Sequence, residues 1–376
     1  MKKFLKVFFG ILVIANIAIL ATGKTYLYKA IYYNFVDIND YPIFNNRTVE
    51  AKNPKSWNIS NDYNKIKIPN ALLWKLEEYK TTAFLVVRND SIVYENYWED
   101  YNDTSLSGSF SVAKSIVNVL VGIALKEGKI KSIDEPAGNY IPEFKTGAKS
   151  KITIRHLLEM SSGLKWDEAY ANPFSITTEA YYGTDLYNLV SNLEVETEPG
   201  KVFNYQSCNS SLLSIIVNKA TGKTVSEYAS EKLWTPINAE HNALWSLDHS
   251  DGVEKGYCCF NTNVRDFARI GKLYLNKGNW NGIQIVDTAF VEESTRPAPL
   301  LRGNGEANKI YGLHWWCINR MNHSIFFARG ILGQYIFVVP DKKMIIVRLG
   351  HKRGEQTPEG YVTDIYTYLD ETLKTF

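Results

Sequence analysis

The chain has 376 residues with 42 basic and 40 acidic side chains, so its formal net charge is only +2. Because positive and negative side chains nearly balance, the chain has no strong field of one sign with which to recognise nucleic acid or an acidic polymer. Hydrophobic residues make up 45% of the chain, enough for a large core in one large domain or two smaller ones.

The first 23 residues join a basic stretch to an apolar one. Three lysines precede an apolar run from Val7 to Ala21, which is interrupted by Gly10 and Asn16. The run is longer than many signal peptides yet shorter than a typical spanning helix, and residues 21–23 form an acceptable cleavage site. Segment 1–23 is therefore predicted to be a cleaved signal peptide or a retained anchor, with a buried core helix as the remaining alternative. Either export route places the rest of the chain in the periplasm or cell envelope, with membrane contact only through this segment.

The remaining elements follow in chain order. The polar, Asn-rich stretch 24–75 is predicted to be an extension on a main body of residues 76–376. Alternation over Thr82–Asp100, interrupted at Asn89-Asp90, predicts a β-hairpin. The spacing of apolar residues and glycines at helix C-termini predict helices at 111–127, 152–164, 207–222, 263–278 and around 362–369. Residues 324–350 are predicted to form two strands joined by a turn at Pro340-Asp341.

Strands at both ends of the chain, with helices between them, predict an α+β fold. An antiparallel sheet would be built from both termini and flanked by helices, with a helical insertion. The cysteines at 208, 258, 259 and 317 form no CxxC pair and no Cys/His cluster with zinc spacing, so no metal site is predicted. They are expected to be small buried residues, although an exported protein could pair them.

Ser111 and Lys114 lie one turn apart at the start of the predicted helix 111–127. The rest of this helix is almost entirely apolar, which is typical of a helix buried on all sides. A lysine there either reaches out to solvent or is desolvated, and desolvation lowers its pKa from about 10.4 toward neutrality. A neutral lysine can then act as the base for the serine. The same spacing recurs at Ser162 and Lys165, but there Gly163 ends a predicted helix and no apolar helix follows, so we interpret it as accidental.

Further motifs accompany this pair in order along the chain. They are "SFSVAKS", "SIDEPAGNYIPEF", "ITIRHLLEMSSGLKWDE", "PGKVFNYQSCNSSLLSIIV", "GYCCFNTNVRDFARIGKLYLNKGNWNG", "YGLHWW" and "ARGILGQYIFVVP". From about Thr82 to the C-terminus the chain resembles the serine β-lactamase and penicillin-binding-protein superfamily, especially class C-type esterases and 6-aminohexanoate-dimer hydrolases.

The resemblance implies a β-lactamase/transpeptidase-like fold without metal or organic cofactor. It also implies a serine hydrolase that cleaves small-molecule esters or short amides through an acyl-enzyme on Ser111. The alternatives are a non-catalytic or sensor-type module of the same fold, or a weak β-lactamase or D,D-peptidase. The oligomeric state stays open.

The second family motif is matched by Tyr205-Gln206-Ser207. By resemblance, Tyr205 relays the proton to the leaving group and Ser207 contacts the substrate; a packed aromatic is the alternative for Tyr205. A phenol of pKa about 10 is a poor base unless a cation lies close, and Lys114 would be that cation.

The third family motif, Lys-Thr-Gly on a strand, is where the chain departs from the pattern. Its literal copy at 145–147 comes too early, and Ala328-Arg329-Gly330 occupies the expected place. The N–H groups of Ser111 and Ile331 would form the oxyanion hole, with Gly330 at the strand edge. Loss of the lysine argues against efficient β-lactam cleavage. Arg329 either replaces that cation or faces solvent.

Aromatic residues are predicted around the cleft. Trp166 and Tyr170 follow the "SSGL" turn, and the resemblance assigns Tyr170 a supporting hydrogen bond to a substrate amide. Trp315 and Trp316 are expected to be buried aromatics, with an acyl-pocket role as the alternative. His156 is expected to be structural.

Overall fold

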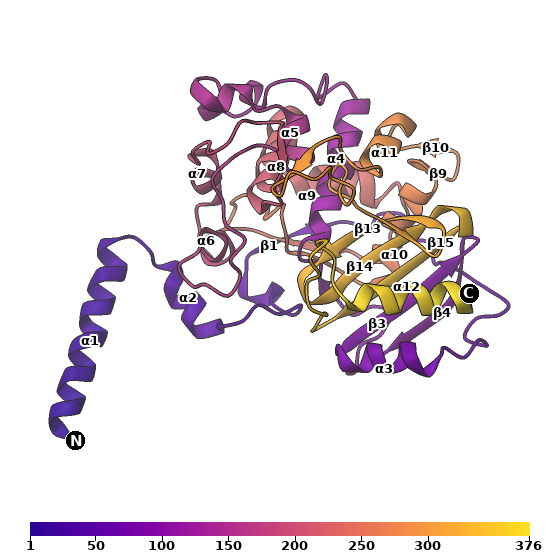
Figure 1. Cartoon of the computed structure of the whole chain (residues 1–376), viewed down its shortest axis with the longest axis horizontal. Coiled ribbons are helices and arrows are strands. Elements are labelled where there is room, and N and C mark those ends of the chain that lie inside the picture. The colour runs from indigo at the N-terminus through magenta and orange to yellow at the C-terminus, as the bar shows by residue number, and fades with distance from the viewer.

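The computed structural model describes all 376 residues and confirms the α+β prediction. Its main sheet has seven strands in the order β12-β13-β14-β15-β3-β4-β2 (Figure 1). Strands from both termini meet in its centre, where β15 pairs antiparallel with β3 and Ile346 lies opposite Val86. The edge pair β2–β4 is parallel. The strands are β2 (Asn58–Ile59), β3 (Thr81–Arg88), β4 (Ser91–Tyr97), β12 (Trp316–Arg320), β13 (His323–Gly330), β14 (Gln334–Val339) and β15 (Met344–Gly350).

The predicted hairpin is present as β3 and β4. Asn89 and Asp90 both adopt left-handed backbone conformations, with φ of 47° and 63°, as a tight two-residue hairpin turn requires. The predicted turn at Pro340-Asp341 is present between β14 and β15. The prediction of only two C-terminal strands is wrong, because the structure has a third, β13. Residues 331–333 reverse the chain between β13 and β14, with Leu332 at φ 61° and Gly333 at φ 87°.

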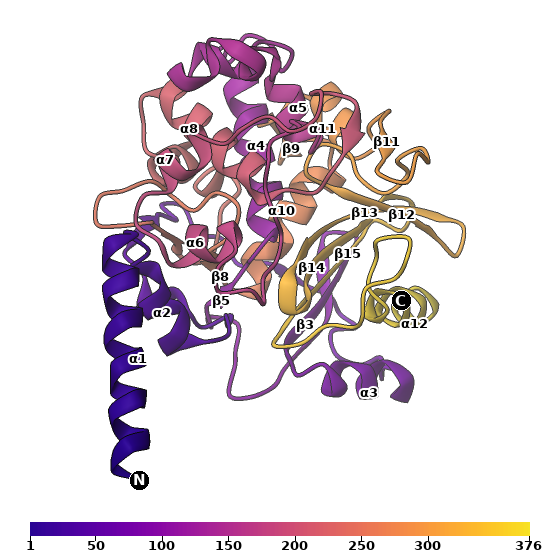
Figure 2. The same cartoon turned by 60° about the vertical axis from the view of Figure 1, so that its left-hand side comes forward.

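Helices cover both faces of the main sheet. On β3, Leu85 and Val87 point into the core shared with α10 and α4, whereas Phe84 and Val86 point into the core shared with α3 and α12. The helices α5, α7, α8 and α11 gather beyond one end of the sheet, in the upper part of Figures 1 and 2, whereas α1 and α2 lie apart from them at the left. The helices are α1 (Lys2–Ala21), α2 (Tyr26–Tyr33), α3 (Asn70–Glu78), α4 (Val112–Lys126), α5 (Ile154–Leu158), α6 (Ile176–Tyr182), α7 (Leu186–Ser191), α8 (Ser207–Thr221), α9 (Val225–Ala229), α10 (Val264–Leu275), α11 (Thr288–Ser294) and α12 (Asp364–Thr375).

One helix agrees with its prediction and another does not. α4 is buried from Val112 to Ala124 and is followed by Gly128 at φ 68°, as its sequence predicts. α5 is much shorter than the predicted 152–164, because Met160 turns into the left-handed region at φ 58°.

A second sheet, which the sequence did not predict, contains four strands in the order β1-β7-β8-β5. Its first strand comes from the N-terminal stretch 24–75, which also buries Ile38 and Trp57. The division of the chain at residue 75 stays a prediction. The remaining strands are β1 (Asn46–Val49), β5 (Ser107–Gly108), β6 (Val202–Phe203), β7 (Ala243–Ser246), β8 (Phe260–Thr262), β9 (Asn279–Trp280), β10 (Ile283–Gln284) and β11 (Leu301–Arg302).

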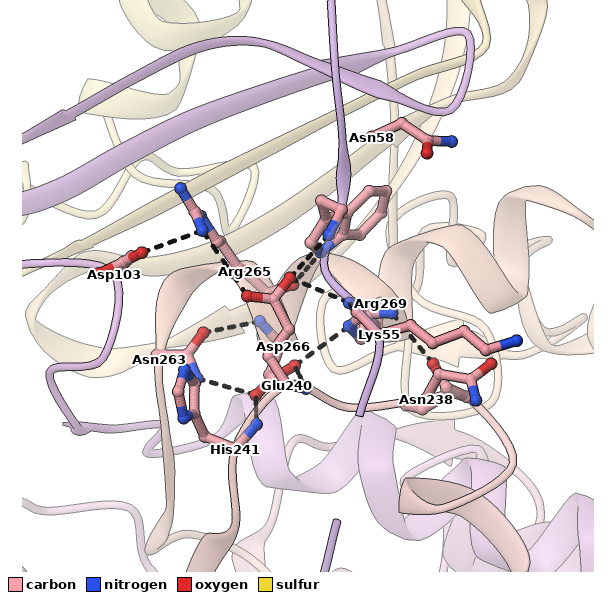
Figure 3. Close-up of polar contacts among 12 residues, drawn as sticks. Lys55, Asn58, Asp103, Asn238, Glu240, His241, Asn263, Arg265, Asp266 and Arg269 are labelled. Carbon is pink, nitrogen blue, oxygen red and sulfur yellow. Dashed lines mark hydrogen bonds and ion pairs between the residues drawn. The ribbon is translucent and has the colours of Figure 1, made fainter. Parts of the chain in front are cut away.

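A polar network at the start of α10 fixes the N-terminal stretch to the body (Figure 3). Arg265 forms an ion pair with Asp103 at 2.9 Å. Arg269 pairs with Glu240 at 3.0 Å and donates to the backbone carbonyl of Lys55. Because these guanidinium groups are buried or nearly so, their several acceptors compensate for the loss of water.

The N-terminal helix α1 extends away from the body and buries none of its residues (Figures 1 and 2). By length and composition it could cross a membrane, which a signal sequence also could. The alternative of a buried core helix is wrong. The Tyr28 hydroxyl of α2 donates to the Asn16 side chain of α1 at 2.8 Å, so the two helices are in contact.

The expectation of four small buried thiols is wrong for one pair of cysteines. Cys258 and Cys259 form a disulfide with each other. Cys259 has a left-handed backbone conformation with φ 66°, a local geometry that the sequence does not reveal. Cys208 and Cys317 are free and buried, as expected.

Candidate active site

Ser111 lies where β5 passes into α4, at the N-cap position of that helix. The preceding turn is held from both sides. Ser109 N–H donates to the carbonyl of Phe260 at 2.8 Å, and Phe110 has φ of 42°, an uncommon conformation for a bulky residue. The serine is thus presented at the end of a sharp, fixed turn and beside the positive end of the helix dipole.

Lys114 is directed at Ser111 and not at solvent. Its Nζ lies 2.8 Å from Ser111 Oγ and 3.0 Å from the carbonyl oxygen of Tyr257, and only 1% of the residue is exposed. Burial lowers the pKa of Lys114 to about 8, while the negative charge of Glu168 opposes the shift. A substantial share of the lysine is therefore neutral near physiological pH.

Tyr205 lies beside Lys114. The lysine Nζ is 5.1 Å from the centre of the phenol ring, which packs against Tyr311 and Trp316. Burial, together with the charge of Glu168, raises the pKa of Tyr205 above its ordinary value. The nearby lysine does not offset these effects, so Tyr205 is a protonated phenol in the resting site.

Glu168 links the predicted cleft residues, and the sequence analysis missed it. Its carboxylate accepts hydrogen bonds from the Trp166 indole at 3.0 Å, from the Ser207 hydroxyl at 3.2 Å, and from the Ser207 N–H and the Tyr170 hydroxyl. Three of the side chains predicted around the cleft, Trp166, Tyr170 and Ser207, are thus bound to one carboxylate. The acidic pair Asp167-Glu168 between the two aromatics was the available signal.

The end of β13 forms the opposite side of the site. A Cβ on Gly330 would collide with the carbonyl oxygen of Ser109, so the strand can run against the nucleophile turn only without a side chain. Ile331 follows it and borders the same cavity as Ser111. Arg329 stacks on Trp316, with its guanidinium carbon 3.6 Å from the ring centre, and donates to the Gly360 carbonyl at 2.9 Å. The alternative that Arg329 simply faces solvent is therefore wrong.

A cavity of about 330 Å³ adjoins Ser111. Ile331 and Ser207 border it on the body side, and residues of α2 and of the segment after it border it on the other. Tyr170 is exposed at its rim. Trp315 and Trp316 are buried and do not line the cavity.

Other candidates lie outside the site. Ser162 is buried and donates to Asn209 at 2.6 Å, whereas Lys165 is exposed. His156 forms part of the capping box at the start of α5. His314, which the sequence analysis did not single out, is buried beside Ser210, and burial lowers its pKa to about 3. It is a neutral, structural histidine.

The sequence model of the beta-lactamase family matches residues 73–364, which is most of the chain. The chain belongs to the beta-lactamase family. It is 27% identical over 323 residues to 6-aminohexanoate-dimer hydrolase of Paenarthrobacter ureafaciens, covering 79% of this chain and 80% of that protein.

Two solved structures show the same fold. A putative 6-aminohexanoate-dimer hydrolase from Bacillus anthracis is 24% identical, with a TM-score of 0.78 over 90% of this chain and 92% of the other. A family VIII carboxylesterase is 15% identical, with a TM-score of 0.64 over 85% and 99%. With this family membership, the protein is a serine hydrolase of the β-lactamase superfamily.

Proposed function

We propose that the protein cleaves ester or short amide bonds through an acyl-enzyme on Ser111. The observation that carries this proposal is the 2.8 Å contact between Ser111 Oγ and the Nζ of a lysine that is almost fully buried. A buried lysine with a pKa of about 8 can accept the serine proton near neutral pH. The names of the relatives, an amide-dimer hydrolase and a carboxylesterase, agree with these two bond types.

In the first half of the reaction, neutral Lys114 takes the proton of Ser111 as the hydroxyl oxygen attacks the substrate carbonyl. The negative charge that develops on the carbonyl oxygen is stabilised by the backbone N–H groups of Ser111 and Ile331. The Tyr257 carbonyl accepts a hydrogen bond from Nζ and so keeps the lysine aimed at the serine.

The tetrahedral intermediate then collapses. The bond to the leaving group breaks as the Tyr205 hydroxyl donates its proton to that group, and Lys114 returns a proton to the phenolate. The raised pKa of Tyr205 keeps its hydroxyl protonated, so that it holds a proton to donate. In the second half water repeats the attack on the acyl-enzyme, and the leaving group is Ser111 itself.

β-Lactams are expected to be poor substrates. The strand lysine of the family pattern is absent, and the cation in its place, Arg329, is already bound to Gly360 and stacked on Trp316. An anionic substrate group therefore finds no free cation on this strand. The apolar helix α1 supports export of the catalytic body, either as a signal sequence or as an anchor.

Labelling with a serine-reactive fluorophosphonate tests the proposal. One adduct per chain is expected on Ser111, together with hydrolysis of p-nitrophenyl acetate that Ser111→Ala abolishes. Ser162→Ala is the matched control, since it changes the other serine of this spacing, and it should retain both. No adduct on Ser111, with undiminished hydrolysis in Ser111→Ala, would refute Ser111 as the nucleophile, whereas no adduct and no hydrolysis by the wild type would favour the non-catalytic alternative.

A further inference from the structure

The segment that follows the N-terminal apolar helix forms one wall of the cavity beside Ser111. Ala30 and Ile31 of α2, with residues 34–36 after it, border the same cavity as Ser111 and Ile331. The catalytic body alone therefore does not enclose this space.

Contacts with the body hold this wall in place. The Tyr33 ring stacks on Tyr182, which itself borders the cavity, with ring centres 6.2 Å apart and planes 7° apart. Further along, the carbonyl oxygen of Ile38 accepts a 2.7 Å hydrogen bond from Gly108, in the strand that leads to the nucleophile turn. The wall and the nucleophile are thus fixed to each other.

The cavity is apolar and uncharged. Twelve of its eighteen lining residues are hydrophobic, and none carries a charged side chain. A charged acyl group would lose its hydration there without gaining a partner, whereas a hydrocarbon chain gains from every methylene that it buries.

The cavity lies on the acyl side of the reaction. Tyr205, the proposed donor to the leaving group, does not border it, whereas Ser111 and Ile331 do. The leaving group then departs on the tyrosine side and the acyl group occupies the cavity.

The mouth of the cavity exposes further apolar side chains. Ile31 of α2 and Phe35 in the segment after it are 69% and 76% exposed, and Figure 2 shows α2 between α1 and α6. Apolar and aromatic side chains beside an apolar helix are typical of the membrane–water boundary.

From these observations we infer that the substrate carries a hydrocarbon acyl chain, and that the N-terminal segment forms the wall against which this chain binds. The inference rests on the proposed hydrolase function and narrows its substrate class to amphipathic esters or amides.

The test measures kcat/KM of the full chain in detergent micelles for p-nitrophenyl acetate, butyrate, hexanoate and octanoate. The constant should rise about two- to four-fold per added methylene until the cavity is filled. Ala30→Phe fills part of the cavity and should lower the octanoate-to-acetate ratio by about ten-fold, the equivalent of roughly two methylenes left unburied. Tyr32→Ser is the matched control, because Tyr32 lies two residues after Ala30 on the same helix, is 81% exposed and does not border the cavity. This variant should leave the octanoate-to-acetate ratio unchanged.

Repeating the octanoate assay with the full chain in phosphatidylcholine vesicles distinguishes a dissolved amphiphile from a bilayer lipid as the source of the acyl chain. Hydrolysis in either setting supports the inference. The inference is overturned if kcat/KM does not change with chain length or is highest for acetate, or if Ala30→Phe leaves the octanoate-to-acetate ratio unchanged. In that case a phosphonate adduct on Ser111 would still support the hydrolase function. If no adduct forms and no ester is cleaved, both fail.

Discussion

The pH dependence of acylation follows directly from the burial of Lys114. The lysine acts as base only when neutral, and its pKa is about 8. Its neutral fraction is then about one tenth at pH 7, one half at pH 8 and nine tenths at pH 9. Accordingly, kcat/KM should rise about five-fold from pH 7 to pH 8 and less than two-fold from pH 8 to pH 9.

Glu168 provides the perturbation that assigns this pH dependence to the lysine. Its negative charge raises the pKa of Lys114, so Glu168→Gln should lower that pKa further and move the rising limb of the profile to lower pH.

The assay is stopped-flow acylation by p-nitrophenyl acetate between pH 5.5 and about pH 10, fitted to a single ionisation. The midpoint of the rising limb is the readout, because it does not depend on any loss of rate from rearranged hydrogen bonds at position 168. Asp167→Asn is the matched control, as it removes a neighbouring charge that is not among the groups shifting Lys114. An unmoved midpoint in Glu168→Gln, or a profile with no limb near pH 8, would refute the assignment of Lys114 as the base.

Three further predictions concern the rest of the site. Tyr205→Phe should slow acylation by alkyl esters by about 10²- to 10⁴-fold, yet slow acylation by p-nitrophenyl esters far less, since p-nitrophenolate leaves without a proton; equal losses in the acylation step for both ester classes would exclude the relay. Asp37, in the N-terminal segment, raises the pKa of His351. Their ion pair therefore holds this segment to the body fully below about pH 6.5, the ordinary pKa of histidine, and the stabilisation is lost as the pH rises through the raised pKa of the folded state. Limited proteolysis of the segment should therefore accelerate above neutral pH in the wild type, and a His351→Gln variant with the same pH dependence would contradict this. Gly330→Ala places a Cβ against the Ser109 carbonyl and should cost about 1–3 kcal/mol in urea unfolding; a fully stable, fully active variant would show that the strand is not held against the nucleophile turn.

The nucleophile helix was predictable because its signal is local. A serine and a lysine one turn apart, followed by almost unbroken apolar residues, predict a buried helix with the lysine beside the serine, whatever surrounds the helix. The hairpin at Asn89-Asp90 was predictable for the same reason, since its turn chemistry lies within two residues.

The missed features depend on contacts between distant segments. Glu168 matters because its loop folds back onto Ser207, 39 residues away along the chain. The third C-terminal strand was missed because Leu332 adopts a left-handed conformation that its residue type does not favour. The wall from α2 belongs to a polar stretch that the sequence analysis treated as a surface extension, and only its packing on Tyr182 places it at the cavity.

The most direct measurement is mass spectrometry of the full chain, quenched in acid during turnover of a p-nitrophenyl ester. The account predicts one added acyl group per chain, located on the peptide that contains Ser111, absent in Ser111→Ala and strongly slowed in Lys114→Met. Turnover without any acyl adduct, or an adduct on another residue such as Ser162, would contradict it.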